Sequence, residues 1–176
     1  MILRAATLDD VDAIHRLIDE SVRRLSVGYY TEQEIESGLR FVFGPDTQLI
    51  HDGTYFVIQA GDGLAAAGGW SRRRTLYGGN QFKSDVDPLL DPTTEPARIR
   101  AFFVHPAHVR KGLATRLFSQ CEIAAKQEGF RAFELGATLP GVPLYRALCF
   151  EEREHVDAML PDSTTLPVVR MVRPIV

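Results

Sequence analysis

The sequence predicts a mixed α/β fold in which one parallel pair of strands lies inside an otherwise hairpin-linked sheet. Three observations support this prediction. Apolar runs with a strand pattern alternate with runs of helical spacing. Residues 99–135 read as a strand, a long helix and a second strand, which is typical of a right-handed crossover between parallel strands. The other expected strands are separated by short turns, as in antiparallel hairpins.

The first part of the chain is expected to form a strand and two helices. Thr7 with Asp10, and Thr31 with Glu34, have the spacing of capping boxes, which mark the starts of helices. Apolar residues at helical spacing follow each of them. These patterns predict a strand at residues 2–5, a helix at 8–25 and a short helix from Thr31 that ends at residues 44–46 (GPD).

The middle of the chain is expected to form a hairpin and a long loop. Residues 54–60 and 64–71 have strand-forming composition and flank a turn at residues 61–63 (GDG). The polar segment at about residues 72–96 contains three prolines and four acidic residues. A connection of that length is usually either functional or disordered.

The last part of the chain is expected to complete the sheet. Gly129 lies where a long helix should end, and Pro143 lies near the start of a short one. The expected elements are strands at residues 99–104, 130–135, 150–156 and 168–172, helices at 111–128 and 143–148, and a turn at 161–167.

Length and composition indicate an ordinary globular protein. The chain has 176 residues, of which 45% are hydrophobic and 24% charged, so we expect a single domain over residues 1–176. The net charge of −3 does not favour a nucleic-acid partner. No apolar run reaches 18 residues and the N-terminus has no signal-peptide pattern, so we expect no membrane span and a cytoplasmic location.

The cysteines and histidines do not indicate a disulfide or a metal site clearly. Cys121 and Cys149 stand alone in apolar surroundings, so we interpret them as small buried hydrophobic residues; a disulfide or a catalytic thiol is the alternative. His105 and His108 could chelate a metal across a turn, but further ligands are missing nearby. We therefore expect a surface turn and no metal.

The segment from Val104 to Ala114 (VHPAHVRKGLA) is the most informative one. It joins an apolar strand to a helix through a basic turn. The first N–H groups of a helix lack partners within the helix and lie at the positive end of its dipole. Gly112 allows a ligand to approach the backbone. The segment thus predicts a phosphate or pyrophosphate site. The alternative is an ordinary turn with a solvated pair, Arg110 and Lys111. No Walker or GxGxxG motif is present.

Residues 98–118 (RIRAFFVHPAHVRKGLATRLF) followed by 136–150 (GATLPGVPLYRALCF) resemble the GNAT superfamily of N-acetyltransferases. The family motif (Q/R)xxGx(G/A) matches Val109, Arg110, Lys111, Gly112, Leu113 and Ala114. The tyrosine of a second motif matches Tyr145, and its Gly-Phe pair matches Cys149 and Phe150. This chain departs from the family at Val109 and at Cys149.

The resemblance implies a mostly antiparallel sheet with a central splayed parallel pair and acetyl-CoA bound where these strands part. The pantetheine arm would pair with the backbone near Phe103 and Val104, and the pyrophosphate would lie on N–H groups of the turn. Tyr145 would act as general acid toward the leaving thiolate; the alternative is a tyrosine that only packs. The implied cofactor-binding residues are Phe103, Val104, Val109, Arg110, Lys111, Gly112, Leu113, Ala114 and Thr115.

The general base is not evident. Arg98 stands where many members carry a glutamate, Glu95 is the nearest carboxylate in sequence, and His105 lies beyond the end of the strand. The expected function is acetyl transfer from acetyl-CoA to a primary amine of a small molecule or peptide. The alternatives are a non-catalytic acyl-CoA sensor or scaffold and, less favoured, an unrelated phosphate-binding protein. A homodimer is compatible with the resemblance, although no residue indicates one.

The resemblance implies that the region of the first two helices and variable loops build the binding site for the acceptor amine. Aromatic residues that could line it are Tyr29, Tyr30, Trp70 and those of the segment 77–82 (YGGNQF), although each could equally be a packing residue. The acidic residues Asp85, Asp87 and Asp91 could attract a cationic amine or could form a solvated loop.

Overall fold

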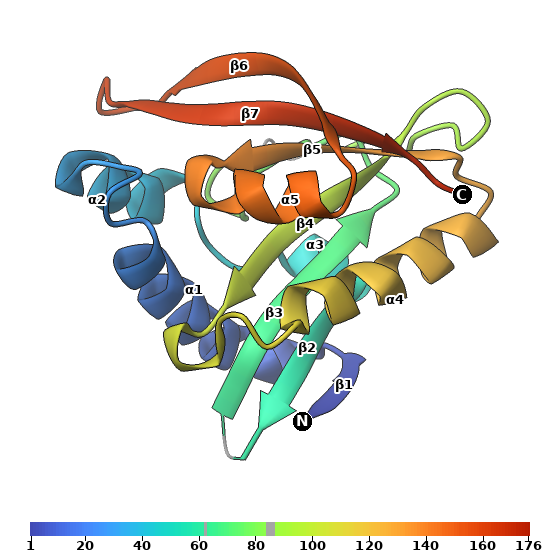
Figure 1. The fold of residues 1–176 in the computed structure, drawn as a ribbon, viewed down its shortest axis with the longest axis horizontal. Helices are drawn as coiled ribbons and strands as arrows, with labels where there is room; N and C mark the ends of the chain where they lie inside the picture. The colour runs from blue at the N-terminus through green and yellow to red at the C-terminus, as the bar shows by residue number, and fades with distance from the viewer. Residues whose placement is uncertain (62, 84–86) are drawn as a thin grey trace.

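The computed structural model describes residues 1–61, 63–83 and 87–176, which form a seven-stranded sheet in the order β1-β2-β3-β4-β5-β7-β6 (Figure 1). The strands are β1 (Ile2–Ala5), β2 (Tyr55–Ala60), β3 (Gly63–Ser71), β4 (Ala97–Val104), β5 (Ala132–Thr138), β6 (Glu151–Met159) and β7 (Thr165–Pro174). The helices are α1 (Val11–Leu25), α2 (Glu32–Phe41), α3 (Thr47–His51), α4 (Leu113–Gln127) and α5 (Val142–Ala147). Short 3₁₀ turns lie at Leu8–Asp10, Pro106–His108 and Leu139–Gly141.

The predicted fold class is confirmed. Strands β4 and β5 are parallel and α4 connects them, whereas the other neighbouring strands are antiparallel. The pairing between β4 and β5 is limited to Ala97 opposite Phe133 and Arg98 opposite Glu134. Beyond these residues the two strands part, which is the splay implied by the family resemblance.

Each face of the sheet carries its own hydrophobic core. On one face α4 and α5 pack on the strands, with Leu117, Phe118 and Phe133 among the buried residues (Figure 1). On the other face α1 and α2 pack through residues such as Ile14 and Ile18. The amphipathic helices predicted from sequence therefore cover opposite sides of one sheet.

Local capping chemistry explains where the N-terminal helices begin. The Thr7 N–H donates to Asp10 Oδ2 at 2.8 Å, and the Thr31 N–H donates to Glu34 Oε2 at 2.7 Å, so both predicted capping boxes are present. Helix α3 was not predicted. Asp46 begins it by accepting a hydrogen bond from the Gln48 N–H at 3.1 Å, whereas sequence reasoning used Asp46 only as the end of the preceding helix.

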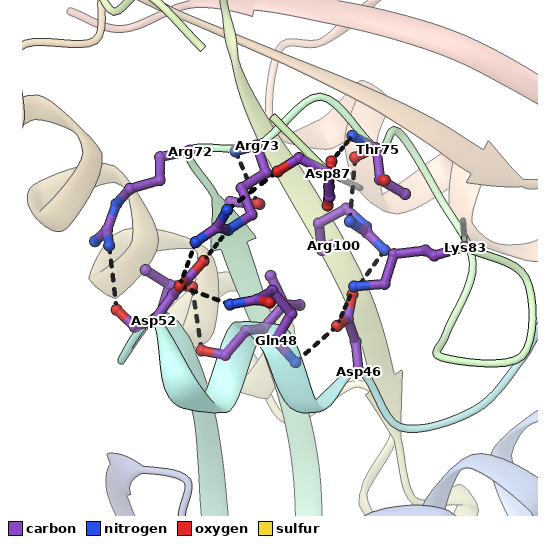
Figure 2. Close-up of polar contacts among 12 residues, drawn as sticks. Asp46, Gln48, Asp52, Arg72, Arg73, Thr75, Lys83, Asp87 and Arg100 are labelled. Carbon is purple, nitrogen blue, oxygen red and sulfur yellow. Dashed lines mark hydrogen bonds and ion pairs between the residues drawn. The ribbon is translucent and has the colours of Figure 1, made fainter. Parts of the chain in front are cut away.

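The long loop between β3 and β4 is a packed segment in its described part. Arg73 binds Asp52, with Nε 2.7 Å from Oδ2, and the Thr75 N–H donates to Asp87 Oδ1 at 2.8 Å (Figure 2). The Leu90 N–H also donates to the Arg72 carbonyl at 2.8 Å. Ion pairs and backbone bonds thus hold this loop against α3 and β3.

The two cysteines differ in environment. Cys121 is buried on α4, as expected, and burial raises the pKa of its thiol. Cys149 is exposed, so the prediction that it is buried was wrong. It follows α5 with φ +63° in a Schellman motif, in which its own N–H donates to the Arg146 carbonyl and the Phe150 N–H donates to the Tyr145 carbonyl. That helix-ending position leaves the Cys149 side chain outside the core. Both thiols are free.

Across the described residues, no helix has the length and apolar character needed to cross a bilayer.

Candidate functional site

A cavity of about 200 Å³ lies where β4 and β5 part. Its walls come from the last turn of α1, the residues that follow α2, the segment 76–79 of the long loop, β4, and the region from β5 to α5. Val168 of β7 completes the lining, so six separate parts of the chain meet at the splay that the family resemblance implied.

A β-bulge in β4 accompanies the splay. Ala67 on β3 lies opposite Phe103 and Gly69 lies opposite Arg100, so two residues of β4 face the single Gly68. Ala101, in the bulge, has φ +53°, and a Cβ at Gly68 would lie 2.3 Å from the Phe102 ring. Beyond Arg98, β5 no longer pairs with β4, and this edge of β4 borders the cavity.

The bulge is fixed from β2. The hydroxyl of the buried Tyr55 donates to the Ala101 carbonyl at 2.9 Å. This bond gives the displaced carbonyl a partner that a regular strand pair would have supplied.

The cavity passes between the two faces of the sheet. Phe102, Leu144 and Tyr145 belong to the core under α4 and α5, and they form what we call the α5 half. The wall on the other face, called the α1 half, is formed by Ser21, Val22, Leu25, Ser26, Val42, Phe43, Gly44, Leu76, Tyr77, Gly78, Gly79, Ala101 and Phe103. Two molecules could therefore meet in the gap from opposite faces.

Tyr145 lies on the wall of the α5 half. Its ring packs edge-on against Phe150 at a centroid distance of 5.6 Å and lies 6.4 Å from Phe102. Burial raises the pKa of its hydroxyl, which therefore keeps its proton at neutral pH. Among the described residues, no hydrogen-bond partner for this hydroxyl is found, so its proton is available to a molecule in the cavity.

The turn before α4 has the backbone of an anion site. Arg110 has φ +61° and Gly112 has φ +73°, with Gly112 as the N-cap, so α4 begins at Leu113, two residues later than predicted. None of the N–H groups of residues 110–115 donates to another described residue. A Cβ at Gly112 would meet no atom within 4 Å. Free N–H groups around open space at a helix start form a concave site for an anion.

The other predicted cofactor-binding residues lie around these two features. Phe103 and Val104 line the cavity through β4. Val109 and Thr115 are exposed at the turn, whereas Leu113 is buried and presents only its backbone. Among the other predicted cofactor-binding residues, Arg110 and Lys111 are exposed and Ala114 is half-buried.

None of the three positions considered for a general base lines the cavity. Arg98 forms an ion pair with Glu134 on β5. Glu95 accepts a hydrogen bond from the Asp91 N–H at 2.8 Å within its own loop. His105 Nε2 lies 2.8 Å from Glu20 Oε2, and its Nδ1 accepts from the Ala107 N–H at 3.1 Å. Each of these groups is occupied elsewhere.

The aromatic residues expected at the acceptor side divide into two groups. Tyr77 lines the cavity, with Phe82 packed at 5.4 Å. Trp70 and Tyr30 do not line it and are packing residues. Trp70 is buried against Phe130. The Tyr30 hydroxyl donates to the Pro167 carbonyl at 2.6 Å and accepts from the Leu139 N–H at 3.0 Å.

Tyr29 is exposed and contributes no wall. The acidic residues of the long loop do not form an acceptor cluster in its described part. Asp87 accepts from the Thr75 N–H, and Asp91 accepts from the Thr93 N–H at 2.9 Å. Asp85 lies outside the described residues.

A buried ionic cluster supports the wall of the α1 half from behind. Arg100 Nη2 lies 2.9 Å from Asp46 Oδ2, and Lys83 binds the other oxygen of Asp46 (Figure 2). Arg100 also donates to the carbonyls of Thr75 and Gly78, on either side of the cavity-lining Leu76. Burial lowers the pKa of Arg100, and the Asp46 carboxylate opposes that shift.

The resemblance implied that the region of the first two helices builds the acceptor side, but sequence reasoning did not identify the individual residues that α1 supplies to the wall. Ser21, Val22 and Leu25 have ordinary core spacing on an amphipathic helix, so no local signal distinguishes them from buried packing residues. Arg100 did carry a usable signal, since a charged residue in the apolar run IRAFFV must find a buried partner.

Within residues 1–61, 63–83 and 87–176, no group of three or more His, Cys, Asp or Glu side chains could hold a metal ion.

No curated protein matches this sequence. Solved structures do match over nearly the whole chain, at sequence identities that establish the fold alone.

A GCN5-related N-acetyltransferase from Rhodopseudomonas palustris has a TM-score of 0.72 at 13% identity, covering 98% of this chain and 94% of that one. The paia N-acetyltransferase of Thermoplasma acidophilum, in complex with coenzyme A, has a TM-score of 0.63 at 13% identity, with 98% of each chain covered. The yncA protein of Salmonella typhimurium, with its cofactor acetyl-CoA, has a TM-score of 0.63 at 16% identity, covering 99% and 94%. The family model described as Acetyltransferase (GNAT) family matches residues 15–149, more than half of the sequence, so this chain belongs to the GNAT acetyltransferase family.

Proposed function

We propose that this protein is an acetyl-CoA-dependent N-acetyltransferase that acetylates a primary amine. The observation that carries the proposal is a single arrangement: a cavity that passes through the sheet, an anion site at the start of α4, and the hydroxyl of Tyr145 on the cavity wall, which has no hydrogen-bond partner among the described residues. Two neighbours in the same family fold hold coenzyme A or acetyl-CoA, which supports acetyl-CoA as co-substrate.

Acetyl-CoA is proposed to bind along β4. Its pyrophosphate would accept hydrogen bonds from the free N–H groups of residues 110–115, with Arg110 and Lys111 supplying positive charge. Its pantetheine arm would pair with the edge of β4 near Phe103 and Val104, where β5 has left the strand. This path places the thioester at the junction of the two halves of the cavity.

The amine is proposed to enter from the α1 half and attack the thioester carbonyl. A C–N bond forms and the carbonyl becomes a tetrahedral oxyanion, which a backbone N–H of β4 stabilises. The C–S bond then breaks, and the proton of the Tyr145 hydroxyl goes to the thiolate. The proton that the nitrogen loses passes to solvent, from which Tyr145 is reprotonated. No covalent enzyme intermediate is needed.

A second candidate is a non-catalytic acyl-CoA sensor or scaffold with the same fold. One observation favours this candidate: among the described residues, no carboxylate or histidine lines the cavity to act as a general base.

Release of free thiol from acetyl-CoA in the presence of a panel of amines tests the proposal, with calorimetric titration of acetyl-CoA on the same sample. Catalysis predicts amine-dependent thiol release. Tight binding of acetyl-CoA without release to any amine would favour the sensor. Failure to bind acetyl-CoA would contradict both candidates.

A further inference from the structure

We infer that the acceptor is a weakly basic amine that enters the cavity in its neutral form and carries an apolar or aromatic group beside the nitrogen. This inference rests on the proposed function and names the substrate class of the same site. It follows from the chemistry of the α1 half.

The wall carries no formal charge in the part of the chain that the structure describes. The residues that line the cavity are aliphatic, aromatic, hydroxyl-bearing or glycine, and its only titratable groups are Tyr77 and Tyr145. Burial raises the pKa of both hydroxyls, so both are neutral at pH 7. An ammonium ion in this cavity would thus have no carboxylate partner on the wall.

The ionic cluster behind the wall offers no free carboxylate to a cation. Both oxygens of the Asp46 carboxylate are bound there, one by Arg100 and the other by Lys83. The Glu20 carboxylate, next to the α1 wall, does not line the cavity and lies 2.8 Å from His105 Nε2. Neither of these two carboxylates is on the wall to receive an ammonium ion.

The carboxyl ends of α1 and α2 also reach the cavity, and a helix end of that kind carries partial negative charge. Backbone donors already occupy three of the carbonyls there. The Val22 carbonyl accepts from the Ser26 N–H, the Gly38 carbonyl from the Val42 N–H, and the Val42 carbonyl from the Gly79 N–H. The polar groups that remain are neutral acceptors, among them the hydroxyls of Ser21 and Ser26, which suit an uncharged amine.

Volume limits the part of the acceptor that the cavity encloses. About 200 Å³ must hold the acetyl thioester and the reacting amine. A dry cavity of roughly 150 Å³ holds one benzene molecule. The apolar wall of Val22, Leu25, Phe43 and Leu76 therefore accommodates about one ring or one branched side chain next to the nitrogen.

Amine basicity gives the size of the expected effect. An amine with a pKa of about 10.4 is neutral in about one molecule in a thousand at pH 7.4, whereas an α-amine with a pKa of about 7.7–8.0 is neutral in about a quarter. A site that takes only the neutral form should thus favour the weaker base by about two hundredfold in kcat/KM.

Four amines separate basicity from apolar character: L-phenylalaninamide, glycinamide, 3-phenylpropylamine and spermidine. Thiol release at pH 7.4 should be fastest with L-phenylalaninamide. With 3-phenylpropylamine, kcat/KM should be about two hundredfold lower and should rise about tenfold per pH unit up to pH 9. Glycinamide should be at least tenfold poorer than L-phenylalaninamide, because it lacks the ring, and spermidine should be the slowest.

Matched variants test the wall itself. Leu25→Glu places a carboxylate in the α1 half, and Leu25→Gln places a neutral group of the same shape. The first should raise kcat/KM for spermidine at least tenfold over the second. Leu76→Glu and Leu76→Gln repeat the comparison from the long loop, and acetyl-CoA binding with thermal unfolding verifies that each variant is folded.

Two results would overturn the inference while leaving the proposed function intact. The first is spermidine acting as well as L-phenylalaninamide at pH 7.4. The second is no difference within the matched pairs of folded variants. Absence of thiol release with every amine would instead contradict the proposed function.

Discussion

The two halves of the cavity are built by different means. Next to the side chains of the α5 half, the donor side uses backbone groups within a short stretch of sequence, namely one edge of β4 and the free N–H groups of residues 110–115. The α1 half uses side chains from helix ends and a loop, supported by ion pairs between residues far apart in sequence. The donor side of such a fold can therefore be recognised from a motif, whereas the acceptor side depends on tertiary structure.

Removing the ionic support of the α1 half should have the largest effect. Arg100→Leu leaves the buried Asp46 with Lys83 as its remaining charged partner, and we expect a loss of about 3 kcal/mol in the free energy of unfolding. Denaturant titration measures this loss. At a temperature where the variant is folded, KM for the amine should rise while acetyl-CoA affinity is retained. An equal loss of acetyl-CoA affinity would show that the two halves are not independent.

Removing the hydroxyl of the α5 half should lower turnover without affecting binding. Tyr145→Phe is expected to lower kcat about a hundredfold, because the thiolate would leave unprotonated. Calorimetry should give the same acetyl-CoA affinity as the parent protein. Since burial raises the pKa of Tyr145, the parent kcat should not fall between pH 7 and pH 10 through loss of this proton. Tyr29→Phe, at an exposed tyrosine, is the control. Unchanged kcat in Tyr145→Phe would exclude the general-acid role.

Blocking the turn before α4 should weaken the binding of acetyl-CoA and leave the selection among amines unchanged. Gly112→Val places a branched side chain in the open space in front of the free N–H groups, so we expect acetyl-CoA affinity to fall at least tenfold, or about 1.4 kcal/mol. The order of preference among amines should not change. Gly53→Val is a matched control, because Gly53 has φ +71° and open space around it but lies at another turn. Equal losses of affinity in both variants would attribute the effect to backbone strain.

The smallest expected effect is on stability and comes from a substitution at Cys149, which lies outside both halves of the cavity. Cys149 has φ +63°, a conformation that costs a non-glycine residue about 1 kcal/mol. Cys149→Gly should therefore raise the free energy of unfolding by up to about 1 kcal/mol and leave acetyl-CoA affinity unchanged. Ala147→Gly, at the end of α5, should instead lower stability, since glycine loses more backbone entropy on folding. A less stable Cys149→Gly would mean that the cysteine side chain makes a contact that offsets the strain.

Much of the fold could be predicted because its signals are local. Both capping boxes, the parallel crossover and the glycine at the end of α4 depend on neighbours within a few residues. The same is true of the turn at Gly112, whose positive φ follows from a glycine at the start of a helix.

The remaining features depend on partners far away in sequence. The bulge at Ala101 carries no glycine and is fixed by Tyr55, which is 46 residues away. Arg100 pairs with Asp46 across 54 residues, and the wall of the α1 half joins helix ends that look like ordinary core in sequence. Tertiary packing alone brings these groups together.

The aperture between β4 and β5 has a further consequence for how this sequence can vary. The edge of this opening consists of backbone peptide groups of β4 and of the turn before α4. A backbone peptide group is present whatever side chain its residue carries. Mutations can therefore accumulate across most of β4 and α4 while the opening persists, provided that a few positions keep their backbone geometry. Such a rim tolerates drift in sequence, which is consistent with neighbours that keep the fold at 13% identity.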